Sequence, residues 1–203
     1  PWNPRSLDLL RNSCASAAGF LLAGATVAPR RTPSGPWQNP RVLEQVLSFL
    51  AGAPDDRFDE LARAAFAFQH RTIAPVRALA ERRGADPAAI RSWREVPMVP
   101  VAAFRRLELA AAPAVEIFRS SGTSGAERSV HHHPFPDLYR AAIDASFPAF
   151  CLPRGDRPPM LALVPPRAQA PDSSLGFMVD HLLARFGDPR SAYAFGARGI
   201  EAA

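Results

Sequence analysis

The chain contains no lysine and only two cysteines among its 203 residues. Its 24 basic residues are therefore all arginines, and they are scattered along the chain singly or in adjacent pairs, with no basic stripe interleaved with aromatic side chains. A net charge of +5 suits an anionic ligand, but without such a stripe we expect no nucleic acid partner. Cys14 and Cys151 lie too far apart for a CxxC motif or a zinc knuckle, so we expect a reducing, cytoplasmic setting.

An apolar run long enough to cross a bilayer is also lacking, and we expect no membrane span. Residues 13–28 are uncharged, follow Arg5 and Arg11, and end in small residues, which is roughly the anatomy of a signal peptide. Their apolar part is too short for a transmembrane helix. A leader segment or translated upstream sequence is the alternative that we favour, and both interpretations stay open.

Prolines concentrate in residues 29–40, which hold four of them together with a glycine. Such a composition is typical of a linker. We therefore expect residues 1–40 to form a leader and a linker whose composition permits disorder. A domain is expected to begin at residue 41 and to comprise residues 41–203.

Helices are expected first. Apolar residues recur at helical spacing in residues 41–52 and again in residues 57–83. Pro75 should kink or split the second helix, and Gly84 should close it. Residues 86–109 predict a short helix followed by an extended segment, because the residues that precede its prolines favour an extended backbone.

Strands and helices alternate afterwards. A helix is predicted in residues 134–150, with Pro136 in its first turn, and a buried strand at Met160–Val164. A capped helix is predicted in residues 172–188, and a strand and turn in residues 191–199. Helices followed by alternating strands and helices predict an α/β fold with a helical N-terminal part.

The segment EIFRSSGTSGAERSVHHH, residues 116–133, contains a run of hydroxyl-bearing residues and glycines: Ser120, Ser121, Gly122, Thr123, Ser124 and Gly125. A phosphate requires backbone N–H groups, short hydroxyl donors and no bulky Cβ, and this run supplies all three. Arg128 adds a positive charge with a fork of donors. The spacing is neither that of a Walker A loop nor that of a GxSxG elbow. On composition alone, a flexible polar surface loop is an equal alternative.

The loop and its flanks resemble the acyl-protein synthetases of bacterial bioluminescence operons, which belong to the adenylate-forming superfamily. The segment SSGTSGAERS resembles that superfamily's phosphate-binding loop, SSGTTGxPK. Phe66 and Gln69 match a Phe-x-x-Gln element of the family's N-terminal helix. Further likeness lies in REVPMVPVAAFRRLEL before the loop and in MLALVPP and SSLGFMVDHLL after it, so the resemblance covers about residues 45–190.

The resemblance implies that residues 41–203 form the N-terminal portion of an adenylate-forming α/β domain, which would be incomplete, with the fold of that region of adenylate-forming enzymes. It also implies a two-stage reaction. ATP, with Mg²⁺ as cofactor, activates a long-chain fatty carboxylate as acyl-AMP, and a protein thiol then takes the acyl group. Residues 120–125 would wrap the β- and γ-phosphates. Arg128 would replace the superfamily's loop lysine and act as the catalytic residue. Glu127 replaces a proline and should point into solvent. An acyl-acceptor or reductase subunit is the implied protein partner.

Several of the superfamily's elements are not recognisable before Ala203: the adenine-binding segment, the acidic Mg²⁺ ligand, the ribose-binding aspartate and the C-terminal subdomain. Two alternatives therefore stay open. One is an acyl-CoA synthetase similar to phenylacetate-CoA ligase. The other is a truncated chain that binds nucleotide or a partner without catalysis.

Other conspicuous residues are expected to be structural. We expect His131, His132 and His133 to form a polar loop, and no metal site, because no further ligand stands at the right spacing. Cys151 lies between apolar neighbours and is expected to be a buried, inert thiol. The remaining candidates are assigned to the core ahead of an acyl pocket: Phe147, Phe150, Phe177 and Met178.

Overall fold

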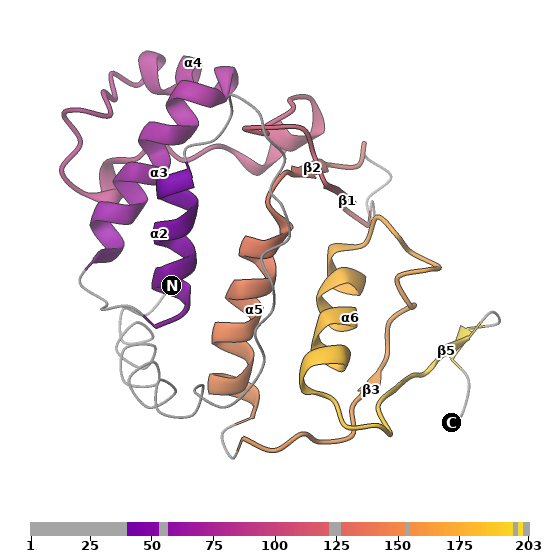
Figure 1. Cartoon of the computed structure of the whole chain (residues 1–203). Helices are drawn as coiled ribbons and strands as arrows, with labels where there is room; N and C mark the ends of the chain where they lie inside the picture. The colour runs from indigo at the N-terminus through magenta and orange to yellow at the C-terminus, as the bar shows by residue number, and fades with distance from the viewer. Residues whose placement is uncertain (1–39, 53–56, 122–126, 153–154, 197–198, 201–203) are drawn as a thin grey trace.

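The computed structural model describes residues 40–52, 57–121, 127–152, 155–196 and 199–200. Helices come first and are followed by short strands and further helices, so the expected mixed α/β class is present (Figure 1). In chain order the elements are α2 (Pro40–Leu50), α3 (Phe58–Thr72), α4 (Ala74–Arg82), η2 (Trp93–Glu95), η3 (Val101–Arg105), β1 (Glu116–Arg119), β2 (Val130–His133), α5 (Pro136–Cys151), β3 (Leu161–Ala162), α6 (Ser174–Phe186), β4 (Ala192–Tyr193), β5 (Phe195–Gly196) and β6 (Gly199–Ile200).

The helical predictions for the first part are confirmed. Gly52 and Gly84 follow α2 and α4 with φ angles of 100° and 62°, a left-handed conformation that ends helices and favours glycine. The long pattern is split at Ile73, which has extended backbone angles. Pro75 lies in the first turn of α4, where its missing N–H costs nothing, and so the chain begins a new helix there.

One core joins α2, α3 and α4 to the chain that leads toward β1. Its buried members are Val42, Phe66, Phe68, Ile73, Val76, Ala80, Ile90 and Ala111. Phe135, just before α5, packs partly buried against the same cluster. Because apolar burial is the main favourable term in folding, this cluster anchors the helical part and the entry to α5.

The helix predicted within residues 86–109 is wrong. This stretch forms a turn and two short 3₁₀ helices, η2 and η3. The Asp86 carboxylate accepts a hydrogen bond from the Ala88 N–H at 2.9 Å, and such an Asx turn competes with helix formation. Asp59 of α3 holds η2 in place, because its carboxylate accepts from the Trp93 N–H at 2.9 Å. That hydrogen bond, followed by one from Ser92, lowers the pKa of Asp59 against the opposing effect of burial.

The second part of the chain contains a parallel β-α-β unit. Helix α6 connects β3 to β4, and these strands pair in parallel with Leu161 opposite Ala192. The strand predicted at Met160–Val164 is shorter than expected, and its predicted burial holds only for Ala162. Leu161 and Leu163 are 57% and 64% exposed. Side chains alternate between the two faces of a strand, and here only one face is covered.

Figure 1 shows how α5 lies between the helical part and α6, and α5 contacts α2 on one side and α6 on the other. The first turn of α5 contains Pro136, as predicted, together with Asp137. Helix α5 thus connects the helical core, through α2, to α6, which lies beside the hydroxyl-rich loop.

We predict that Phe66→Ala lowers the free energy of unfolding by about 3–5 kcal/mol, because Phe66 is 2% exposed at the centre of the core. Gln69→Ala on the same helix is the control, since Gln69 is exposed and its replacement should change stability by less than about 0.5 kcal/mol. Urea denaturation of both variants checks this. Equal losses would show that α3 does not bury Phe66 as described.

Candidate functional site

A short antiparallel hairpin brings the two ends of the hydroxyl-rich loop together. Strand β1 pairs with β2 so that Glu116 lies opposite His133 and Arg119 lies opposite Val130. The sequence does not predict either strand, because four residues are too few for a strand pattern to be distinguished from a loop. His131, His132 and His133 therefore belong to a strand, and their assignment to a loop is wrong.

Hydrogen bonds close the base of the loop. The Ser120 N–H donates to the Ser129 carbonyl at 3.0 Å, and the Ser129 N–H donates to the Ser120 hydroxyl oxygen at 2.9 Å. The Arg128 Nε donates to the Ser120 carbonyl. Ser129 is buried by these contacts, whereas Ser120 and Ser121 are exposed. Of the predicted phosphate-binding residues, Gly122, Thr123, Ser124 and Gly125 lie outside the described part of the chain.

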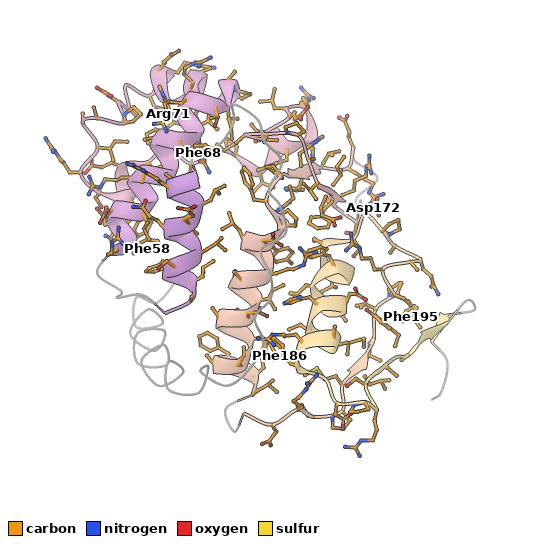
Figure 2. The ribbon with its side chains drawn as sticks, viewed as in Figure 1. Phe58, Phe68, Arg71, Asp172, Phe186 and Phe195 are labelled. Atoms are coloured by element: carbon orange, nitrogen blue, oxygen red, sulfur yellow. The ribbon has the colours of Figure 1, made fainter. Side chains whose placement is uncertain are left out.

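Asp172 meets the loop base from the segment that leads into α6. Its carbonyl accepts from the Arg119 N–H at 2.9 Å. Its carboxylate oxygen Oδ2 lies 3.4 Å from Arg128 Nη2 and 3.8 Å from Arg119 Nη1. Two guanidinium groups thus share one carboxylate. Figure 2 shows Asp172 at the end of α6 that lies nearest the hairpin.

The N-terminus of α6 contributes a positive potential beside the loop base. The helix begins after Ser173, whose hydroxyl accepts from the Gly176 N–H at 3.0 Å, so the predicted capped helix is confirmed. Asp172 immediately precedes this cap. Because the N-terminal end of a helix dipole is positive, an anion is favoured at this position.

Aromatic packing holds the hairpin against α5 and α6. Phe118 of β1 is 2% exposed and meets Phe177 of α6 at a centroid distance of 5.4 Å. Tyr139 of α5 stacks on Phe177 at 5.5 Å. The predicted core position of Phe177 is therefore confirmed. Arg167 lies over the Phe177 ring at 4.9 Å and binds both carboxylate oxygens of Glu116 at 2.6 Å.

The histidines of β2 make separate contacts. His131 stacks on Phe104 at 4.4 Å, and His132 Nδ1 lies 3.6 Å from a carboxylate oxygen of Glu108. His133 packs against Phe118 at 5.1 Å. In the described ranges, no group of three or more His, Cys, Asp and Glu side chains is arranged to hold a metal ion.

Two predictions for the end of α5 are wrong. Cys151 is exposed, and so is Phe150 at 56%, although both were expected to be buried. Phe147 contacts Phe186 of α6 at 5.5 Å. Helix α5 packs against α2 and α6. In its last turn, Phe150 and Cys151 are not covered by these helices and remain exposed to solvent. Met178 of α6 is half-buried. Glu127, at the loop base, is exposed as expected.

Comparisons with protein-family models, with curated proteins and with solved structures give no match to this chain. Within the described residues, no helix has the length and apolar character needed to cross a membrane. The function must therefore be inferred from the site itself.

Partial burial lowers the pKa of His133 below its ordinary value of 6.5, and the nearby His131 lowers it further, against the opposing charge of Glu116. Below pH 6.5 the unfolded chain therefore takes up a proton that the folded chain resists. We predict that stability falls as the pH drops from 6.5 toward the lowered pKa, and that His133→Gln makes this fall shallower. Urea denaturation across this pH range checks the prediction, and parallel curves for the two proteins would contradict it.

Proposed function

We propose that this chain uses ATP to activate a long-chain fatty carboxylate as acyl-AMP and passes the acyl group to a protein thiol, as the acyl-protein synthetases do. The proposal includes the fold of the N-terminal region of adenylate-forming enzymes. The observation that carries it is the convergence, at one loop base, of exposed serines, two arginines and the start of α6.

The groups at the loop base suit a polyphosphate. The Ser120 hydroxyl oxygen already accepts from the Ser129 N–H, so its own proton remains to be donated to a ligand. Arg128 and Arg119 are each 45% exposed and present forked donors. Donors of this kind, with a helix N-terminus behind them, are what phosphate oxygens require.

In the first stage, a carboxylate oxygen of the fatty acid attacks the α-phosphorus of ATP. A new oxygen–phosphorus bond forms acyl-AMP, the bond between the α-phosphorus and the bridging oxygen breaks, and pyrophosphate leaves with that electron pair. Negative charge grows on the phosphate oxygens during this step. Arg128 and the Ser120 hydroxyl stabilise that charge because hydrogen bonds at the loop base already set their positions.

In the second stage, the thiolate of an acyl-acceptor protein or reductase subunit attacks the acyl carbonyl and AMP leaves. Mg²⁺, bound to the nucleotide, would supply neutralising charge. Among the described residues, no group of three or more His, Cys, Asp and Glu side chains is arranged to hold the ion, and we assign no step to the metal.

Exchange of labelled pyrophosphate into ATP tests the first stage directly. The purified chain, with Mg²⁺, should catalyse exchange that depends on tetradecanoate and not on phenylacetate. Absence of exchange from folded protein would overturn adenylate formation by this chain. A preference for phenylacetate would overturn the fatty-acid assignment and favour the acyl-CoA synthetase alternative.

We predict that Arg128→Ala raises the Kd for ATP about tenfold and that for AMP less than twofold, because the guanidinium serves the β- and γ-phosphates. Arg190→Ala is the matched control: it also removes an arginine paired with an aspartate, Asp188, but at the opposite end of α6. Isothermal titration calorimetry measures both. Equal weakening of ATP and AMP would contradict the role given to Arg128.

A further inference from the structure

The anionic group bound at the loop base is a side chain of the protein itself, the Asp172 carboxylate. The Asp172 carboxylate lies against Arg119 and Arg128 and directly before the first turn of α6. These are the groups that the proposed function assigns to the triphosphate of ATP. An incoming phosphate and the Asp172 carboxylate must therefore compete for the same donors.

The backbone fixes Asp172 in this place. Its carbonyl accepts from the Arg119 N–H, and the next residue, Ser173, caps α6. Neither contact uses the Asp172 side chain. The carboxylate can therefore turn away from the arginines without any loss of hydrogen bonding in β1 or α6.

Arg128 does not need Asp172 for its position. Its Nε donates to the Ser120 carbonyl, which ties the guanidinium to the loop base independently. The distances from Asp172 to Arg128 and Arg119, 3.4 and 3.8 Å, exceed the 2.7–2.9 Å or so of a charge-assisted hydrogen bond. With the carboxylate 32% exposed, such a loose pair is weak and costs little to break.

We propose that Asp172 is an internal competitor for the phosphate site. In the free chain its carboxylate occupies Arg119 and Arg128, and a polyphosphate displaces it. This inference rests on the proposed function, to which it adds Asp172 as the group that the phosphates must displace. Since one carboxylate shields both arginines, a ligand of higher charge displaces it more readily than a singly charged anion does.

Isothermal titration calorimetry with inorganic tripolyphosphate tests the inference. Asp172→Asn should bind this probe about fivefold more tightly than the wild-type chain, because a weak competing ion pair has been removed. Asp137→Asn is the matched control: Asp137 lies in the first turn of α5 and pairs with Arg140, so the variant loses the same charge at a comparable position. Its affinity should stay within about twofold of the wild type.

A double-mutant cycle separates competition from long-range repulsion. In an Arg128→Gln background, Asp172→Asn should gain less than about twofold, because a contested donor is gone. If Asp172→Asn still raises the affinity about fivefold in that background, the carboxylate acts only by long-range repulsion of the ligand, and the competition is overturned. In the wild-type chain, the Arg119 Nε–Hε signal in nuclear magnetic resonance spectra should shift when tripolyphosphate is added, and an unchanged signal would also overturn it.

The remaining outcomes separate the two proposals. If the wild-type chain binds tripolyphosphate and Asp172→Asn binds it equally or less tightly, the competition is overturned while the proposed function stands. If neither protein binds it, the phosphate site itself is refuted, and the competition falls with it.

Discussion

The contact between Phe118 of β1 and Phe177 of α6 determines the geometry of the whole site. A hairpin with four residues in each strand is not stable alone, so it needs a partner surface. The ring centroids of Phe118 and Phe177 lie 5.4 Å apart, and Tyr139 of α5 stacks on the Phe177 ring. This packing places the loop base beside the start of α6, where the Arg119 N–H reaches the Asp172 carbonyl.

The arginines near that contact differ in what they can do. Arg167 binds both oxygens of Glu116 at 2.6 Å and covers Phe177, so its charge is fully used in holding the hairpin. Arg119 and Arg128 lie farther from the Asp172 carboxylate, at 3.8 and 3.4 Å, and Arg128 also donates to the Ser120 carbonyl. The same residue type is thus structural in one place and available to a ligand in the other, and distance to the carboxylate decides which.

Local signals in the sequence predicted local structure well. The helices were located from apolar spacing, and the end of α4 from Gly84. The Asx turn at Asp86 depends on a side-chain hydrogen bond, which the spacing of apolar residues does not reveal. Leu161 is exposed because no other element packs on its face of the strand, and the spacing of apolar residues does not reveal that either. Arg128 was identified from its place beside the loop. Asp172 was missed as a site residue because only folding brings it to a loop so distant in the sequence.

The central claim is that the closed loop base holds the phosphates of ATP, and hydrogen–deuterium exchange tests it most directly. The amides of residues 116–133 should be monitored with and without saturating Mg·ATP, with those of α3 as an internal reference. The account predicts that bound nucleotide slows exchange across the hairpin and at the start of α6, while exchange in α3 is unchanged. Equal exchange rates in the hairpin with and without Mg·ATP would contradict it.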